Sequence, residues 1–427
     1  MLKSVEYRIY PNKKQEILLA KHFGCNRLIY NKMLDLRTSY FLKYHESISK
    51  YELNTYITFL KKTDEYNFLK EVHSQTLQQT VQDLDTAFIN YFRNPDKKDL
   101  KGKVKKKLQR GEDVVITLSD HVGYPNYKTK HSNRHSVRFP QGGKINKENN
   151  KIFIPKIKWI KAKIHRIIEG EIHSVTIKKV PSGKYFAVFL IEDNIPYLPE
   201  LPIEGNKTIG IDMGLKDFCI LSTGTKITNP KFLRNKECRL KILQKRLSRK
   251  QKGSKNRNKT RIKVAKLHEK IYNERKDFLN KLTTQLANDN QVSTYCLETL
   301  NIKRMVKNHK LAKSISEASW YQFKILLESK CKKLGKHVIF IGQFEPSSKL
   351  CPCGYKNNSL SLQDREWTCP ICKTHHDRDI LAANNIKNMA LTKLNITNIS
   401  RSERPVELEE LLSLDRALNQ EAMSFRP

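Results

Sequence analysis

The chain has 427 residues and carries 81 Lys and Arg against 43 Asp and Glu, which gives a formal net charge of +38 at pH 7. Its 38% of hydrophobic residues is enough to build buried cores, so a wholly disordered binding tail is excluded. A charge excess of this size makes a compact protein repel itself, and bound nucleic acid would relieve that repulsion. A chain of this length usually folds into about two to four domains.

No segment has the composition of a membrane span or of a secretory signal. The longest apolar run, YFAVFLI at 185–191, is much shorter than the ~20 residues that cross a bilayer. The first residues, MLKSVEYRIYPNKKQ, are charged and lack an apolar stretch. Five of the nine cysteines stand singly in the sequence, as reduced thiols do, so we expect an intracellular protein without membrane contact.

The N-terminal part opens with a strand-like segment and continues as helices. Residues 1–10 alternate apolar and polar side chains until a proline breaks the pattern. Asn12 and Gln15 fit a capping box at the start of an amphipathic helix, and helical periodicity returns at 74–94. We therefore predict a helical recognition segment with a basic loop at residues 11–124.

Strand-like alternation follows between about 135 and 195, in segments separated by QGG, EG and PSG turns. The N-terminal strand could join these segments in one sheet. We predict a small β-barrel, or wedge-like domain, formed by residues 1–10 and 125–198, with the helical segment inserted between them.

Beyond residue 198, strand-like and helical segments alternate. TIGIDMGLKDFCILSTG, which starts at Thr208, predicts two strands joined by a tight turn, and two long basic helices follow at 236–290. VSTYCLETL then predicts a strand, SWYQFKILLESKCKKL a helix and HVIFIGQF a further strand. This order indicates a second domain of the α/β class.

Three acidic residues stand at the edges of elements in this second region. Asp212 follows the apolar strand TIGI, Glu298 ends the strand VSTYCL, and Asp379 precedes the helical segment ILAANNI. Mg²⁺ takes hard oxygen ligands, and carboxylates that converge from different elements can hold two such ions for phosphodiester hydrolysis. Taken separately, each residue is equally typical of an exposed acid at the end of a strand.

A cysteine-rich segment lies directly before Asp379. Its four cysteines form two close pairs: Cys351, Cys353, Cys369 and Cys372. Four thiolates can bind Zn²⁺ tetrahedrally, and such a site replaces a core that is too small to fold alone. Gly354 suits a tight turn after the first pair. The alternative is four free thiols in a loop.

Several segments together resemble the TnpB family, the OrfB-type accessory proteins of bacterial insertion sequences. The resemblance runs from about residue 3 to 390, and the segments that carry it are YRIYPNKKQEILLAKHFGCNRLIYN, GEIHSVTIKKVPSGKYFAVFL, GIDMGLKDFCILSTG, LETLNIKRMVKNHKLAKSISEASW, EPSSKLC and HHDRDILAANNI. TnpB proteins are relatives of type V CRISPR effectors. The resemblance implies an RNase H-like (RuvC) nuclease in the bacterial cytoplasm, guided by an RNA made from the element's end.

By the same resemblance, Asp212, Glu298 and Asp379 match the first, second and third catalytic acids and would hold two Mg²⁺ ions. Asp379 is preferred to Asp377 because the family's acid stands just ahead of a helix that here reads LAANNI. The implied nuclease domain covers 199–350 and 376–390, a zinc-binding nucleic-acid loop covers 351–375, and a flexible tail covers 391–427.

The sequence departs from the family pattern at two places. The first cysteine pair is C-x-C where the family usually has C-x-x-C, so His375 or His376 could substitute as a zinc ligand. Leu381 stands where the family's third motif usually has Asn, which could alter the support of the metal site. Neither departure removes a catalytic carboxylate.

The resemblance thus predicts an endonuclease, acting as a monomer, that binds a guide RNA and cuts double-stranded DNA beside a short adjacent motif. Two other functions stay open. One is an RNA-guided repressor that binds DNA without cutting it, and the other is a transposase that acts by strand transfer.

Overall fold

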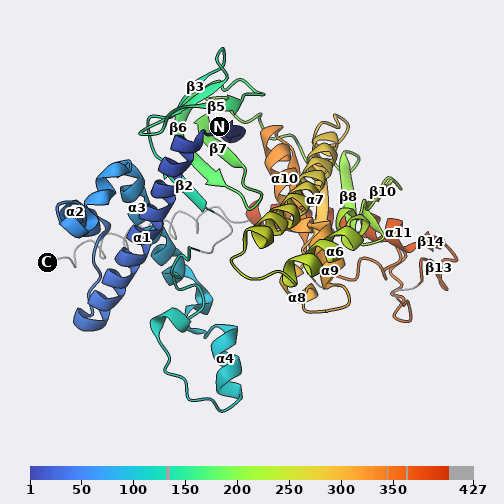
Figure 1. Ribbon diagram of the computed structural model, residues 1–427. Helices are drawn as coiled ribbons and strands as arrows, with labels where there is room; N and C mark the ends of the chain where they lie inside the picture. Colours follow the sequence, from blue (N-terminus) through green and yellow to red (C-terminus); the bar gives the residue numbers. More distant parts are fainter. Residues whose placement is uncertain (131–134, 344, 362–363, 403–427) are drawn as a thin grey trace. The chain divides into compact units, whose positions relative to one another are not determined.

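The structure, a computed structural model, describes residues 1–130, 135–343, 345–361 and 364–402, and it divides into two compact units (Figure 1). The first unit contains Met1–Pro196 and Lys250–Lys266, and the second contains Tyr197–Arg249 and the described residues from Leu267 onward. Among the described residues, no helix combines the length and the apolar character needed to cross a membrane.

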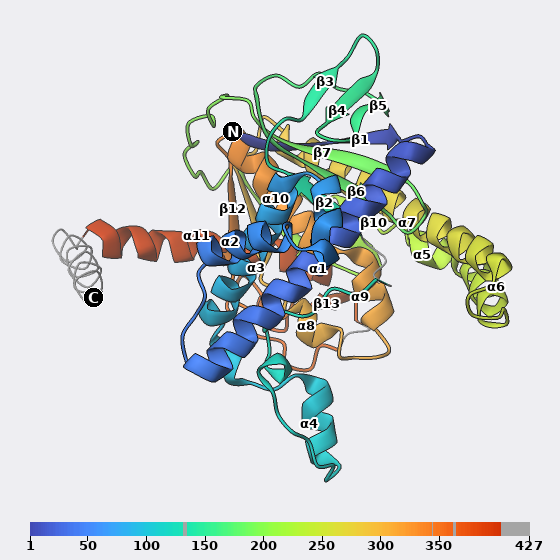
Figure 2. The same cartoon turned by 60° about the vertical axis from the view of Figure 1, so that its left-hand side comes forward.

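In the first unit, the strands, α-helices and 3₁₀-helices (η) are β1 (Leu2–Tyr10), α1 (Lys13–Tyr44), α2 (Lys50–Leu60), η1 (Asp64–Glu71), α3 (Ser74–Arg93), η2 (Pro95–Lys98), α4 (Gly102–Gln109), η3 (Leu118–Asp120), β2 (His135–Phe139), β3 (Lys144–Asn146), β4 (Lys151–Ile154), β5 (Lys158–Lys163), β6 (Glu171–Lys179) and β7 (Tyr185–Glu192). The expected capping box opens α1, since the Gln15 amide donates to Asn12 Oδ1 at 2.9 Å and the Asn12 amide donates to Gln15 Oε1 at 3.1 Å. Helices α1, α2 and α3 share one apolar core, and α4 stands apart from them (Figure 2).

The seven strands of the first unit form one antiparallel sheet in the order β2-β6-β7-β1-β5-β4-β3. The N-terminal strand β1 lies inside this sheet, between β5 and β7. Tyr7 and Tyr185 are buried in its core, whereas Tyr10 and Trp159 are 48% and 43% exposed. Within the described part of the chain no pairing joins the edge strands β2 and β3, so the closed barrel expected from the sequence is not confirmed.

In the second unit the elements are β8 (Thr208–Met213), β9 (Asp217–Leu221), β10 (Lys226–Thr228), α5 (Phe232–Asn235), α6 (Glu237–Ser248), α7 (Lys255–Ala287), β11 (Thr294–Glu298), α8 (Ile302–Met305), α9 (Ala312–Ala318), α10 (Trp320–Lys333), β12 (His337–Ile341), β13 (Glu366–Thr368), β14 (His375–Asp377) and α11 (Arg378–Ser402). The first residues of α7, up to Lys266, group with the first unit. Helix α11 continues beyond residue 390, where the sequence predicted the start of a tail. The remainder of that expected tail, 403–427, lies outside the described residues.

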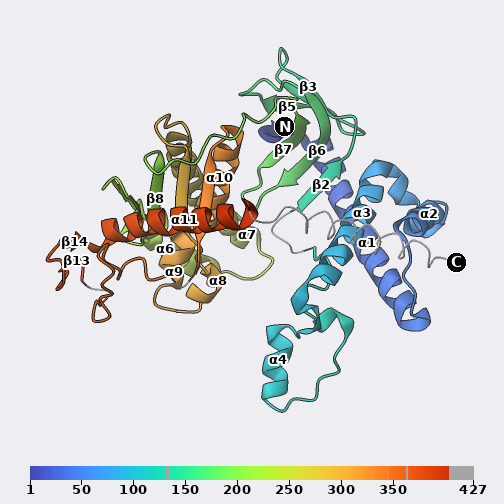
Figure 3. The same ribbon diagram turned by 180° about the vertical axis from the view of Figure 1, so that it is seen from behind.

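The second unit is built on a five-stranded sheet in the order β10-β9-β8-β11-β12, in which β8, β11 and β12 run parallel. Tyr295 and Leu297 of β11 belong to an apolar core with residues of α7 and α10. Cys296, between them, packs instead with Ile386 of α11. Side chains along a strand alternate between faces, so these helices cover opposite sides of the sheet. Figure 3 shows α11 running in front of β8.

Candidate active site and cysteine loop

The first two candidate acids lie at adjoining strand ends in the second unit. β8 and β11 are parallel neighbours in which Ile211 pairs with Leu297, and Asp212 and Glu298 each follow this pair by one residue. Ile211 and Leu297 belong to the core with α7 and α10. Because the next residue in each strand points to the opposite face, both carboxylates point to the face that α11 covers.

A glycine lets the third acid approach the same place. A Cβ atom on Gly210 would lie only 1.9 Å from the carbonyl oxygen of Ala383, so the backbone of α11 rests directly on β8. Asp379 precedes Ala383 by four residues, about one helical turn. Gly210 precedes Asp212 by two residues and therefore lies on the same face of the strand. Helix α11 thus carries Asp379 toward the end of β8 that bears Asp212.

The electrostatics of Asp212 show that the three acids act on one another. Burial, together with the negative charges of Glu298 and Asp379, raises the pKa of Asp212 to about 7, although Arg378 opposes this rise. Glu298 and Asp379 are thus near enough to act on the charge of Asp212, and a bound cation would relieve this repulsion. Carboxylate oxygen atoms are the ligands that Mg²⁺ prefers, so the donor set fits a divalent metal.

Asp379 and Asp377 have different partners. Arg378 Nη2 and Arg365 Nη1 donate to the Asp379 carboxylate at 2.9 and 3.0 Å. Asp377 Oδ1 accepts from the amides of the second and third residues of α11 at 3.0 and 3.1 Å, as an N-cap does, and its Oδ2 accepts from Lys226 Nζ at 2.6 Å. Both carboxylates therefore have partners. Asp379 is the better candidate for a metal ligand because its charge, and not that of Asp377, contributes to the raised pKa of Asp212.

Sequence reasoning assigned no role to several residues that contact these acids. Ser347 donates a hydrogen bond to Glu298, and Asn385 of α11 donates to the backbone of Ser347. Both lie in segments that carried the family resemblance, EPSSKLC and LAANNI, so the signal was present without an assignment. Arg365, which contacts Asp379, stands in no pattern that the sequence alone distinguished.

The four cysteines that the sequence singled out lie together. Their Sγ atoms are all within 4.8 Å of one another, with Cys351 and Cys372 3.5 Å apart and Cys353 and Cys369 3.6 Å apart. Tetrahedral zinc with Zn–S bonds of ~2.3 Å places sulfur atoms ~3.8 Å apart, so this donor set fits Zn²⁺. The Thr374 hydroxyl beside Cys372 Sγ lowers the pKa of that thiol to about 6, whereas burial raises the pKa of Cys351 to about 12, so the two neighbouring thiols differ.

The shortened first pair still closes a turn. The Gly354 amide donates to the Cys351 carbonyl at 2.9 Å, and Gly354 adopts a φ of +92° that suits glycine. His376 lies beside the cluster, with Nε2 3.1 Å from Cys351 Sγ, whereas His375 contacts Thr368 instead. The four thiols therefore form the cluster by themselves, and neither histidine substitutes for a cysteine in it.

Leu381 packs on the cysteine loop. Its side chain is 5% exposed and belongs to an apolar cluster with Leu360, Trp367 and two of the cysteines. The residue that departs from the family pattern therefore joins α11 to the loop through apolar contact. A leucine side chain has no polar atom, so Leu381 cannot make the polar contact that an Asn at this position could make.

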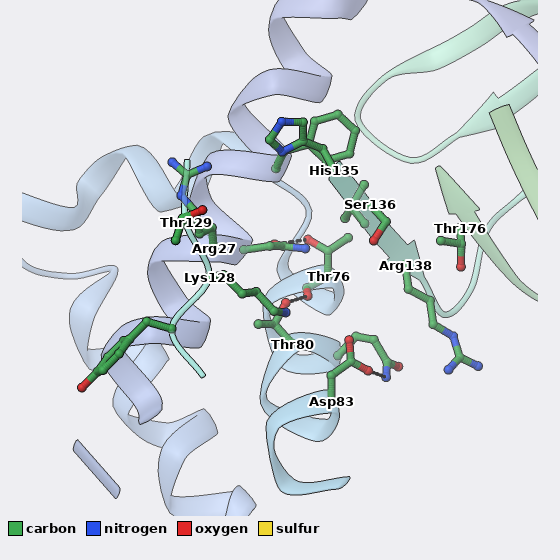
Figure 4. Close-up of a pocket in the computed structure, with 15 residues that line it drawn as sticks. Arg27, Thr76, Thr80, Asp83, Lys128, Thr129, His135, Ser136, Arg138 and Thr176 are labelled. Carbon is green, nitrogen blue, oxygen red and sulfur yellow. Dashed lines mark hydrogen bonds between the residues drawn. The ribbon is translucent and has the colours of Figure 1, made fainter. Parts of the chain in front are cut away.

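The first unit contains a second candidate site, a polar pocket of about 580 Å³ (Figure 4). Helices α1 and α3, strand β2 and the segment before it line this pocket, and Arg27, Lys128 and Arg138 supply cationic groups. Lys128 Nζ lies 3.7 Å from the centre of the Tyr30 ring, and burial lowers the pKa of the lysine. Neutral groups such as Gln79 and one carboxylate, Asp83, complete the lining, in which the three cationic side chains are the groups suited to phosphates.

Comparison with known proteins assigns the chain to a family. The family description "Probable transposase" (OrfB, IS605 type) matches residues 191–309, "Cas12f1-like, TNB domain" matches 320–386, and "Helix-turn-helix domain" matches 1–45. A predicted RNA-guided DNA endonuclease of Streptomyces pristinaespiralis is 37% identical over 392 residues, which are 90% of this chain and 88% of that protein. The chain belongs to the TnpB family.

The TnpB assignment extends over most of the chain. InsQ of Escherichia coli K12, also named as a predicted RNA-guided DNA endonuclease, is 25% identical over 428 residues, which are 96% of this chain and 97% of InsQ. Among solved structures, the Cas12f1–sgRNA–target DNA complex aligns over 91% of this TnpB chain and 99% of the Cas12f1 chain, with a TM-score of 0.49 and 15% identity. Within the region matched as helix-turn-helix, the structure has β1 and one continuous helix, α1.

Proposed function

We propose that this TnpB protein is an RNA-guided, divalent-metal-dependent DNA endonuclease encoded by a transposable element, which cuts double-stranded DNA next to a short adjacent motif. The observation that carries the proposal is the grouping of Asp212, Glu298 and Asp379, in which the other two acids help to raise the pKa of Asp212. Mutual repulsion among three carboxylates costs folding stability, so the cluster is better explained by chemistry than by architecture. Its place on a sheet with α11 supports an RNase H-like (RuvC) nuclease domain.

In this proposal Asp212, Glu298 and Asp379 hold two Mg²⁺ ions. Bound metals would activate a water molecule and stabilise the leaving oxygen of the phosphodiester. The protein supplies the geometry: β8 and β11 present two of the carboxylates, and α11 presents the third. Arg378 and Arg365 restrict the rotation of the Asp379 carboxylate through their hydrogen bonds.

The cysteine loop would hold Zn²⁺ through Cys351, Cys353, Cys369 and Cys372. Such an ion organises a segment whose own apolar cluster is small. Strand β14 connects the second cysteine pair to α11, so a folded loop restricts the start of the helix that bears Asp379. We propose that the loop also handles nucleic acid beside the candidate active site.

The first unit would bind the adjacent motif and the guide heteroduplex. In RNA-guided nucleases base pairing reads most of the sequence, and the protein reads a short motif and the shape of the duplex. The pocket with Arg27, Lys128 and Arg138 offers cationic and neutral polar groups for these contacts. The formal charge of +38 supports a polyanionic partner.

The decisive experiment is to express the protein with its native flanking DNA, sequence the RNA that co-purifies, and test cleavage of a matching duplex. We expect one discrete structured RNA that ends in a variable stretch, and cleavage that needs Mg²⁺ and is lost in Asp212→Ala. Binding of the matching duplex without cleavage would favour the repressor function. Joined DNA products would favour strand transfer, and only random cellular RNA would refute RNA guidance.

A further inference from the structure

Two polar residues with no assigned role connect the candidate acids to one another. Ser347, in the segment before the first cysteine, is 7% exposed, and Asn385 of α11 is 4% exposed. The Ser347 hydroxyl donates a hydrogen bond to Glu298 Oε1. Asn385 Nδ2 donates to the carbonyl oxygens of Ser347 and Leu350 at 2.7 and 2.6 Å. Helix α11, which bears Asp379, is thereby joined to the second acid through a single intervening residue.

The direction of these hydrogen bonds follows from chemistry. Both partners of the Asn385 side chain are backbone carbonyls, which only accept, so the amide nitrogen must face them. The Ser347 hydroxyl in turn donates to Glu298 when that carboxylate is ionised, because an ionised carboxylate only accepts. A buried Asn that donates to two carbonyls at these distances holds the backbone of Ser347 firmly.

The contact gives one of the two oxygens of Glu298 a hydrogen-bond partner. Within the described ranges no hydrogen bond or ion pair engages the other oxygen, Oε2. The terminal torsion of a glutamate is otherwise broad, so a fixed hydrogen bond to Oε1 restricts the carboxylate to one orientation. Because Oε1 already accepts from Ser347, it has one lone pair fewer for a metal, and Oε2 is the oxygen that keeps both.

We propose that Ser347 and Asn385 are positioning residues that make Glu298 a one-oxygen metal ligand and so favour Mg²⁺ over Ca²⁺. This inference rests on the proposed function, in which Glu298 is a metal ligand. Mg²⁺ demands near-octahedral geometry with single oxygens, whereas Ca²⁺ accepts more ligands and often binds both oxygens of one carboxylate. Removing the Ser347 hydroxyl frees Oε1, which disfavours the small ion and allows the larger one to take both oxygens.

The test measures metal binding by calorimetry without nucleic acid, so it is independent of whether the protein cuts DNA. Mn²⁺ serves as the octahedral probe and Ca²⁺ as the larger ion. We expect Ser347→Ala and Asn385→Ala to weaken Mn²⁺ binding about tenfold or more, the usual effect of removing a group that orients a ligand. Ca²⁺ binding should stay unchanged or tighten, so the ratio of the two affinities shifts. Ser347→Thr, which keeps the hydroxyl, should restore the wild-type ratio.

Neighbouring residues supply matched controls. Ser348→Ala removes the adjacent hydroxyl, and Asn384→Ala removes an amide that donates to the Ile380 carbonyl within α11 at 3.1 Å. Neither should change the ratio. In a Glu298→Gln background, Ser347→Ala should have no further effect on it, because the coupling runs through that carboxylate.

An unchanged ratio in folded Ser347→Ala, or equal weakening of both ions, would overturn the proposal. Failure of the wild-type protein to bind Mn²⁺ at millimolar concentration would overturn it as well, since Glu298 would then not be a metal ligand. If Asn385→Ala does not fold, the comparison of Ser347→Ala with Ser347→Thr decides the question. Ser347→Ala deletes only one oxygen atom, and Ser347→Thr keeps it.

Discussion

Asp212→Asn should make the metal-free protein more stable while abolishing metal-dependent cleavage. Burial and the charges of Glu298 and Asp379 raise the pKa of Asp212 from 3.8 to about 7. Between these values the folded state keeps a proton that the unfolded state has released, so stability falls as the pH rises through this range. At about 1.4 kcal/mol for each pH unit, the upper limit of this loss is about 4 kcal/mol at pH 8. Asn carries no charge, so the Asp212→Asn variant avoids this loss of stability.

The assay is urea unfolding at pH 5 and pH 8, without added divalent metal. We expect Asp212→Asn to increase the free energy of unfolding by up to about 4 kcal/mol at pH 8 and by about 2 kcal/mol at pH 5. The increase is smaller at pH 5 because this pH lies little more than one unit above the pKa of an unfolded Asp. Added Mg²⁺ should stabilise the wild-type protein and leave the variant unchanged.

Asp193→Asn is a control of opposite sign. Hydrogen bonds from Lys3 and from the N-terminal amine hold the pKa of Asp193 well below its usual range, so this substitution should destabilise the protein at pH 8. If Asp212→Asn gave no gain at pH 8, or the same gain at both pH values, the electrostatic account of the acid cluster would be refuted.

Three further predictions concern the other parts of the molecule. Gly210→Ala should destabilise the second unit by about 3 kcal/mol, because its Cβ would lie 1.9 Å from the Ala383 oxygen and push α11 away; a variant with wild-type urea stability and Mn²⁺ affinity would contradict this contact. Purified protein should contain one Zn²⁺ per chain, and Cys369→Ser should lose both the zinc and thermal stability. Cys238→Ser, outside the cluster, should retain the zinc. Mass spectrometry of the zinc content distinguishes these outcomes. Arg138→Gln in the polar pocket should weaken nucleic-acid binding and reduce the salt dependence of log K by about one, and an unchanged slope would place the phosphate contacts elsewhere.

The local chemistry could be predicted from the sequence because each of its patterns lies within a short segment. The spacing of four cysteines predicted a thiol cluster, and their Sγ atoms lie within 4.8 Å of one another. The capping box at Asn12 and Gln15 likewise needs only neighbouring residues, and it is present at the start of α1. The candidate acids stand at the edges of strands or helices, and the family resemblance distinguished them from ordinary exposed acids.

Their arrangement depended on contacts between distant segments. Asp212 and Glu298 point to one face because β8 and β11 pair in a register that places Ile211 opposite Leu297, which no local pattern specifies. The seven-stranded sheet is likewise completed by β1 at its interior, and the closure that strand patterning predicted was not confirmed.

The roles of Ser347 and Asn385 could not be predicted for the same reason, although both residues lie in segments that carry the family resemblance. Asn385 donates to a carbonyl 38 residues away, and Ser347 lies 49 residues from the carboxylate that it contacts. Hydrogen bonds over such separations leave no periodic trace in composition or spacing. The sequence by itself therefore determined which ligand types this protein possesses, whereas the tertiary structure decided which of them meet and which side chains contact each carboxylate, because those depend on strand register and helix packing.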